Sequence, residues 1–245
     1  MDTTHLVLLF LAVGLIAFLY SSVGHAGASG YIATMTLFGL APTVIRPTAL
    51  VLNILVASIG TFQFWRAGHF SWKLFWPFAL LSVPAAYVGG YLQPSASVLR
   101  ILIGVVLLFS AARLVFRKSD PSQTVPPSQP VAISVGAGLG LLSGLTGTGG
   151  GIFLTPLLLF CQWAPIRQAA AVSALFIWVN SIAGLVGYFT KVHSIPSLGL
   201  ILAAAAIIGG IAGSNLGSRH LAVRVISLFL ATVLLIAGMK LIFTR

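Results

Sequence analysis

The chain has 245 residues, of which 58% are hydrophobic and only 6% charged, and 13 Lys and Arg stand against 2 Asp and Glu. Soluble domains carry roughly 25% charged residues, so this composition excludes a water-soluble fold. The net charge of +11 does not indicate nucleic-acid binding, because the basic residues are scattered singly between apolar runs. The expected partner is the lipid bilayer, and no nucleic acid is expected.

The first part of the chain divides into five apolar segments. Charges and turn residues place them at 6–22, 28–41, 45–65, 73–92 and 98–116. No charged residue occurs in the 43 positions between Asp2 and Arg46, a run long enough for two membrane segments. The glycine-rich stretch 21–30 interrupts this run, and the segment that follows is too short to cross a bilayer comfortably at about 1.5 Å per residue.

A polar stretch rich in proline separates this part from the rest of the chain. It runs from Lys118 to Pro130 and contains Asp120 and four prolines. Such a composition is typical of a linker. We therefore expect a first membrane repeat at 1–117, a cytoplasmic linker at 118–130 and a second membrane repeat at 131–245.

The second part repeats the order of the first. Its apolar segments lie at 131–145, 150–162, 167–189, 196–216 and 222–243, and a glycine-rich interruption at 143–151 again precedes a short segment. Landmarks recur at a nearly constant offset, of 123 positions from Gly24 to Gly147 and of 124 from Gly89 to Gly213. This spacing indicates a duplicated unit.

The predicted fold is an all-α polytopic membrane protein. It has two homologous halves of four to five hydrophobic segments each, with broken or re-entrant short helices at the start of each half. The repeats are inverted if all five segments of each half cross the membrane, or if the first two segments of each half form a re-entrant hairpin. If those two segments together make a single broken crossing, each half has four crossings. In either case the loops on one side of the membrane hold eight basic residues and those on the other side hold five. The side with eight includes the linker, and we assign it to the cytoplasm. We favour inverted repeats with both termini outside, because the N-terminal flank carries no basic residue.

Glycines also recur every four residues in two of the segments, a spacing that lets helix backbones approach closely. The two sets are Gly136, Gly140, Gly144 and Gly209, Gly213, Gly217. We interpret both as packing faces, used within one chain or between the copies of a homodimer.

The two carboxylic side chains, Asp2 and Asp120, lie outside every apolar segment. A buried carboxylate that binds a cation or relays a proton is therefore not expected. The glycine-rich loops precede short helices, whose free N–H groups and positive dipole ends suit a small anionic substrate. Since the sequence has neither a carboxylate dyad nor metal-ligand spacing, we expect no catalytic residue, no metal and no cofactor, and hence no enzyme.

The candidate substrate-binding residues lie in the two loops and on the helices that follow them. They are Gly24, His25, Gly27, Ser29, Asn53, Thr146, Gly147, Thr148, Gly149, Gly150, Gly151, Ser173, Asn180 and Ser181. The last three share one helical face, where polar groups either donate to oxyanion oxygens or bond neighbouring helices.

Three basic residues have candidate roles of their own. His25 is the one titratable group in either loop, so it is either the proton-coupling residue or a histidine that only bonds the backbone. Arg46 and Arg167 follow the two Ala-Pro turns. They attract anions at the mouths of a cavity or, more simply, anchor the chain at the membrane interface.

These motifs resemble a known family. The stretch 147–151 with Pro156, the two Ala-Pro turns, and the run 172–176 leading to 180–184 resemble the TauE/SafE family, also called the sulfite exporter or toluene sulfonate uptake permease family. The first loop departs from the glycine triplet, having Gly24-His25-Ala26-Gly27. The resemblance implies secondary transport of sulfite, sulfoacetate or a related sulfonate across the bacterial cytoplasmic membrane, and the family includes both exporters and importers.

The working hypothesis is an exporter that operates by alternating access and holds one anion between the glycine-rich loops, with His25 as the proton carrier if transport is proton-coupled. The alternatives are a passive anion channel, a transporter of a non-sulfur organic anion, and a partner subunit that does not itself transport.

Overall fold

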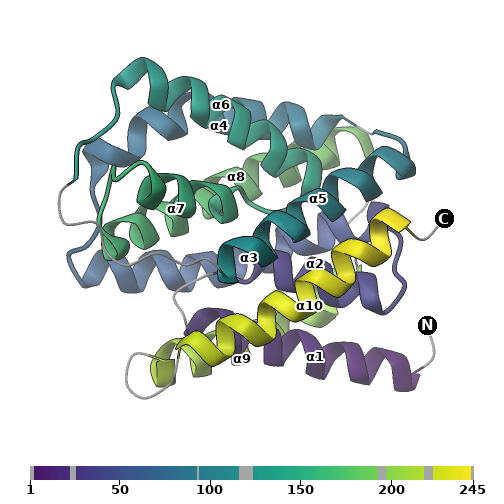
Figure 1. Cartoon of the computed structure of the whole chain (residues 1–245). Coiled ribbons are helices and arrows are strands. Elements are labelled where there is room, and N and C mark those ends of the chain that lie inside the picture. The colour runs from purple at the N-terminus through teal and green to yellow at the C-terminus, as the bar shows by residue number, and fades with distance from the viewer. Residues whose placement is uncertain are drawn as a thin grey trace.

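The computed structural model describes residues 3–22, 26–92, 94–115, 124–192, 197–217 and 223–243 (Figure 1). All regular structure in these ranges is helical. The helices are α1 Thr3–Ser22, α2 Ala28–Leu37, α3 Pro42–Arg66, α4 Trp72–Tyr91, α5 Ala96–Val115, α6 Gln129–Thr146, α7 Gly151–Phe160, α8 Ile166–Val192, α9 Ser197–Gly217 and α10 Val223–Phe243.

Each of the ten predicted segments is a helix, and the differences at the ends have local causes. The prediction that the second segment continues to residue 41 is wrong, because Gly39 adopts a φ of +79° and turns the chain after α2. The amide of Leu40 then donates to the carbonyl of Met35 at 3.1 Å, which satisfies a carbonyl at the end of the helix. The end of α7 is closed in the same way, by a bond of 2.8 Å from the amide of Trp163 to the carbonyl of Leu158.

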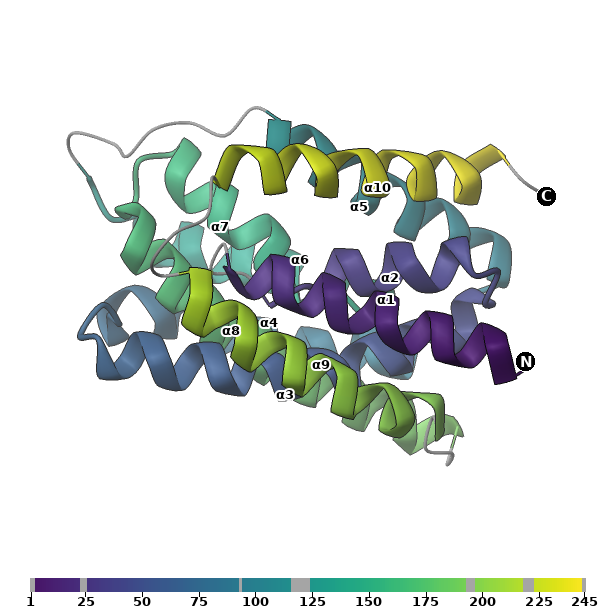
Figure 2. The ribbon, with the colours of Figure 1, turned by 90° about the horizontal axis from the view of Figure 1, so that it is seen from below.

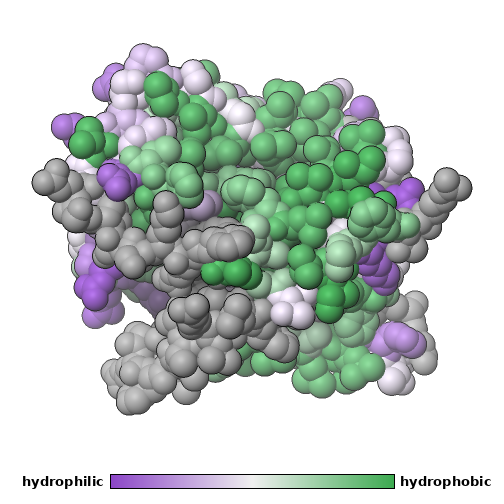
Figure 3. All heavy atoms as spheres, in the orientation of Figure 1, coloured by the Kyte–Doolittle hydropathy of each residue, from purple (hydrophilic) through white to green (hydrophobic). Residues whose placement is uncertain are grey.

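The helices form a membrane-spanning bundle. Five of them, α1, α3, α4, α6 and α8, are long and apolar enough to cross a membrane. Large apolar side chains point outward from the bundle, such as Leu11, Phe62 and Ile208, each more than 60% exposed. Figure 3 shows hydrophobic residues gathered over the middle of the molecule and hydrophilic residues at its two ends. A lipid-facing belt between two aqueous surfaces has this appearance.

The order of helix lengths in α1–α5 recurs in α6–α10. Each set contains one helix of 10 residues, α2 or α7, followed by a helix of at least 25 residues, α3 or α8. The packing follows the same correspondence (Figure 2). Helix α1 packs on α9 and α6 packs on α4, while α3 pairs with α8 and α5 with α10. If α1–α5 are exchanged with α6–α10 in order, the α1–α9 pair becomes the α6–α4 pair. The α3–α8 and α5–α10 pairs are each converted into themselves.

Glycine faces make the closest of these contacts. A Cβ atom added to Gly140 of α6 would lie 2.1 Å from the carbonyl oxygen of Ser82 on α4, and one added to Gly213 of α9 would lie 2.1 Å from the carbonyl oxygen of Phe18 on α1. Such distances are shorter than any contact of a real side chain, so the backbones touch directly. The prediction that the glycine repeats are packing faces is confirmed for Gly136, Gly140, Gly144, Gly209 and Gly213, and they pack within one chain.

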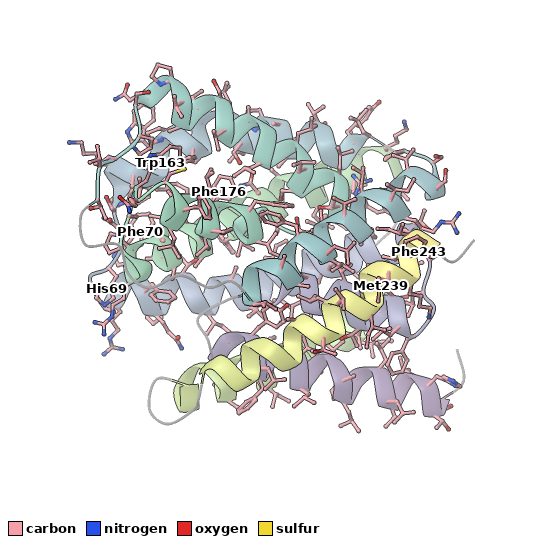
Figure 4. All side chains as sticks on the ribbon, in the orientation of Figure 1. His69, Phe70, Trp163, Phe176, Met239 and Phe243 are labelled. Carbon is pink, nitrogen blue, oxygen red and sulfur yellow. The ribbon has the colours of Figure 1, made fainter. Side chains whose placement is uncertain are left out.

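The start of α1 and the end of α10 lie at the same end of the bundle (Figures 1 and 2). The turns between α3 and α4 and between α7 and α8 lie at the other end, as the labelled residues His69, Phe70 and Trp163 show (Figure 4). Aromatic residues gather there, with the rings of Phe78 and Trp163 6.1 Å apart. A position near the headgroups suits tryptophan, which has an apolar ring and a polar N–H group.

Candidate functional site

The two short helices reach only part of the way across the membrane. Ten residues at about 1.5 Å each span about 15 Å, half of a hydrocarbon core of about 30 Å. Each helix begins at a left-handed glycine, Gly27 with a φ of +85° for α2 and Gly150 with a φ of +77° for α7, and neither N-cap forms a side-chain hydrogen bond. The first turns therefore present backbone N–H groups and the positive end of the helix dipole.

The loop before α7 is pressed against α3 and α8. Gly147, Gly149 and Gly150 all have positive φ angles, which L side chains rarely adopt. A Cβ atom on Gly149 would lie 2.6 Å from the side chain of Ile177 and 2.9 Å from the hydroxyl of Ser181. Glycine is therefore required here both by conformation and by space.

Three buried polar side chains surround this loop with unused hydrogen-bonding atoms. Asn53 of α3 donates through Nδ2 to the carbonyl of Gly147 at 3.1 Å, but its Oδ1 has no partner in the part of the chain that the structure describes. The hydroxyls of Ser181 and Ser143 also have none, and all three side chains are fully buried. Burying a polar atom without a partner is costly, and these three unpartnered atoms lie beside the loop that leads into the N-terminus of α7.

The other candidates on α7 and α8 bond to protein groups. Asn180 donates through Nδ2 to the carbonyl of Phe176 at 2.8 Å and accepts at Oδ1 from the hydroxyl of Ser82 at 2.5 Å. Ser173 accepts from the hydroxyl of Thr155 at 2.8 Å. The expectation that the polar face of α8 points inward is confirmed, because Ser173, Asn180 and Ser181 are all buried. In this arrangement Asn180 and Ser173 hold helices together, and Ser181 remains unbonded.

The hydroxyls of Thr146 and Thr148 form a hydrogen bond of 3.0 Å, and Thr146 also bonds the carbonyl of Leu142 at 2.7 Å. Both threonines are fully buried. If Thr146 donates to Leu142, Thr148 is the donor of the shared bond, and the pair fixes the loop as α6 ends. Gly151 begins α7, and a Cβ atom there would lie 2.4 Å from the side chain of Ile177.

The first loop is described in part. Gly24 and His25 lie outside the described residues, so the structure places neither. Ser29 is buried, and its hydroxyl shares a hydrogen bond of 2.8 Å with the hydroxyl of Tyr20. Tyr31 lies beside Gly27. The position of Tyr31 was not predicted from the sequence, although its spacing of four residues from Gly27 is a signal that would have found it.

The two arginines do not occupy equivalent places. Arg167 is exposed, whereas Arg46 is buried and donates from Nε to the carbonyl of Gly144 at 2.9 Å and from Nη1 to that of Leu92 at 2.8 Å. Its Nη2 atom donates to the carbonyls of Gly89 and Gly90. Four of its five N–H donors therefore bond backbone carbonyls at the ends of α4 and α6, and its role in attracting anions stays a prediction.

The unpartnered atoms lie where two hydrophobic cores meet. The first core is built by α1, α2, α3, α5, α9 and α10 together with Ile177 of α8, and the second by α4, α6, α7 and α8. Asn53 projects from a helix of the first core onto the loop between α6 and α7 of the second. Trp178 packs against both cores. We call this boundary, with Asn53, Ser143, Gly147–Gly151 and Ser181, the polar seam.

Broken helices whose N-termini face buried polar groups at membrane depth are typical of secondary transporters. The comparisons with known proteins agree with this class. The family described as Sulfite exporter TauE/SafE matches residues 9–241. The chain belongs to this family and is a multi-pass membrane transporter, which confirms the resemblance seen in the sequence.

Curated relatives cover nearly the whole chain. The probable membrane transporter protein y4hK of Sinorhizobium fredii is 40% identical over 98% of this chain and 99% of its own length. The probable membrane transporter protein YjnA of Bacillus subtilis is 26% identical over 89% of this chain and 92% of its own. A probable membrane transporter protein of Methanocaldococcus jannaschii is 26% identical over 78% and 76%. No solved structure is significantly similar.

Proposed function

We propose that this transporter carries a small sulfur-containing anion, such as sulfite, sulfoacetate or a related sulfonate, out of the bacterial cytoplasm by alternating access. The observation that carries the proposal is the polar seam, where unpartnered buried groups surround the N-terminus of the half-membrane helix α7. Because none of the described helices contains a carboxylate side chain, a cation would find no counter-charge there. An anion would find backbone N–H groups, a serine hydroxyl and a positive dipole end.

The unpartnered acceptor atom of Asn53 favours certain anions over others in the polar seam. The Oδ1 atom of Asn53 accepts hydrogen bonds but cannot donate them, and it has no protein partner. An oxyanion that carries a proton of its own, as hydrogensulfite does, would donate to this atom while accepting from Ser181 and the backbone. Among the proposed substrates, this contact favours hydrogensulfite, which carries a proton, over a sulfonate group, which carries none at neutral pH.

The packing also supports inverted repeats at 1–117 and 131–245. Helix lengths recur in order, and the packing pairs of one half exchange with those of the other. The start of α1 and the end of α10 lie at the end of the bundle opposite the α3–α4 and α7–α8 turns (Figure 1). Exposed basic residues Arg66, Lys73 and Arg167 are at or next to those turns, so we assign that end, with the linker at 118–130, to the cytoplasm.

Alternating access requires two bodies that move about a central site. The two hydrophobic cores provide such bodies, and the seam lies between them. A rocking motion of one core against the other would open the seam first to one aqueous side and then to the other. Since Asn53 and the loop at 147–151 belong to different bodies, such a motion would change the shape of the site.

The test is uptake into proteoliposomes of purified protein, with sulfite, sulfoacetate, taurine, thiosulfate, acetate and chloride offered with and without a pH gradient. We expect a saturable signal for a sulfur oxyanion and none for acetate. A non-saturating, ohmic current would indicate a channel, and preference for acetate would indicate a non-sulfur substrate; either result would overturn the proposal. Stimulation by the gradient that disappears in His25→Ala would assign proton coupling to that residue.

A further inference from the structure

The N-terminus of α2 has a polar side chain of its own that the polar seam does not include. Tyr31 is the fourth residue of α2 and is fully buried. Helical side chains lean toward the N-terminus of their helix, and that of Tyr31 reaches back to the N-cap. A Cβ atom on Gly27 would lie 2.9 Å from both the Cζ atom and the hydroxyl oxygen of Tyr31.

The hydroxyl of Tyr31 has no hydrogen-bond partner among the described residues. The neighbouring Tyr20 differs, because its hydroxyl bonds Ser29 at 2.8 Å and its ring covers Gly30, where a Cβ atom would lie 2.5 Å away. Two tyrosines therefore enclose the first turn of α2, one with its hydroxyl used by the protein and one with its hydroxyl free. A buried phenol is normally paired.

The free hydroxyl and the end of the helix point to the same kind of ligand. Gly27 has a left-handed backbone and forms no side-chain cap, so the first N–H groups of α2 are presented beside the phenol. Both are donors in an apolar surrounding that contains Ile16, Ile32 and Met35. Donors without a nearby carboxylate are suited to the oxygens of an anion.

We propose that Tyr31 binds the transported oxyanion by donating a hydrogen bond to it at the N-terminus of α2. This inference rests on the proposed function and adds a second contact region in the first half, built from a phenol and a helix end. The polar seam uses an amide, hydroxyls and a glycine-rich loop instead. The ligand class is a small oxyanion with several equivalent acceptor oxygens, such as the sulfite or sulfonate group.

The two tyrosines allow a matched experiment. Tyr31→Phe removes a hydroxyl that has no partner among the described residues, so the thermal midpoint of the anion-free protein should stay the same or rise. The KM for sulfite uptake should increase about tenfold, the usual effect of losing one hydrogen bond to a charged group. Tyr20→Phe should lower the midpoint instead, because it leaves the hydroxyl of Ser29 without the partner that it has in the wild-type protein.

The possible results separate this proposal from the one on which it depends. If the wild-type protein takes up sulfite and Tyr31→Phe does so with the same KM, the role of Tyr31 is overturned. The proposed transport function then still stands. A lower thermal midpoint in Tyr31→Phe, with unchanged KM, would show a structural role. If folded wild-type protein takes up no anion of the panel, the proposed function fails, and the role of Tyr31 fails with it.

Discussion

Ser181 and Asn180 are adjacent on α8 but have different surroundings. Both polar atoms of the Asn180 amide have a partner, Ser82 for Oδ1 and Phe176 for Nδ2, whereas the hydroxyl of Ser181 is unpartnered beside Gly149. Loss of a bonded group leaves its partner unsatisfied, and loss of an unbonded one does not. At the scale of single residues, the structure thus separates groups that hold the helices from groups available to a substrate.

Ser181→Ala should therefore weaken transport without weakening the fold. We expect the KM for sulfite to rise about tenfold, as for the loss of one charge-assisted hydrogen bond, with no decrease in the thermal midpoint in detergent. Ser110→Ala in α5 is the control, because that buried hydroxyl bonds the carbonyl of Val106 and lies outside the seam. Equal KM values for wild type and Ser181→Ala would remove this residue from the site.

Arg46 should behave in the opposite way. Its guanidinium satisfies carbonyls at the ends of α4 and α6, and the single nitrogen of lysine cannot reproduce this geometry. Arg46→Lys should lower the stability by about 3 kcal/mol, since hydrogen bonds to charged groups contribute roughly 1.5–3 kcal/mol each. Reversible unfolding in mixed micelles measures this. The control is Arg66→Lys, at an exposed position, and an Arg46→Lys protein as stable as this control would contradict the assignment.

At the scale of helices, the contact between α4 and α6 depends on the absence of side chains. Gly136, Gly140 and Gly144 bring α6 onto the backbone of α4, whereas Gly138 of the same helix has no other atom within 4 Å of the place where a Cβ would lie. Membrane helices associate through such close packing, because lipid offers no hydrophobic drive between them. One helix therefore contains both an essential and a dispensable glycine.

Alanine at these two positions should have opposite effects. Gly140→Ala would place a methyl group 2.1 Å from the carbonyl oxygen of Ser82 and force the helices apart, so we expect a large loss of folded, monodisperse protein. Gly138→Ala should preserve or raise the thermal midpoint, because alanine favours a helix by up to about 1 kcal/mol over glycine. Size-exclusion profiles and melting curves measure both. Similar yields of the two variants would contradict this packing.

The elements were predictable from sequence because they depend on local pattern. Apolar runs, Ala-Pro turns and glycine spacing predicted ten helices, two short ones and the glycine faces. The bonding partners were not predictable, because they lie far apart in the chain: Ser82 and Asn180 are 98 residues apart, as are Arg46 and Gly144. The buried asparagine and serine residues therefore look alike in the sequence, although only some of them have polar atoms without a hydrogen-bond partner in the described structure.

At the scale of the whole molecule, the arrangement of the two halves decides which surfaces face the same compartment. Cys161 is exposed in the turn between α7 and α8. Ser95 is exposed in the connection between α4 and α5. Inverted repeats place these two positions on opposite sides of the membrane, whereas four crossings per half would place both outside.

Thiol labelling tests this arrangement. In intact cells, a membrane-impermeant maleimide should label Ser95→Cys in a Cys161→Ser background, and it should label the native Cys161 only after permeabilisation. The Cys161→Ser protein without a new cysteine is the control for background reaction. Labelling of Cys161 in intact cells would contradict inverted repeats with a cytoplasmic linker.

The central claim is that a small sulfur oxyanion binds between the two cores and is carried across by alternating access. Counterflow in proteoliposomes tests it most directly, with the inside preloaded with unlabelled sulfite and a trace of labelled sulfite added outside. The account predicts a transient accumulation of label above equilibrium, because a carrier returns loaded from each side, and its reduction in Ser181→Ala. Entry of label that only approaches equilibrium, from folded protein, would contradict a carrier.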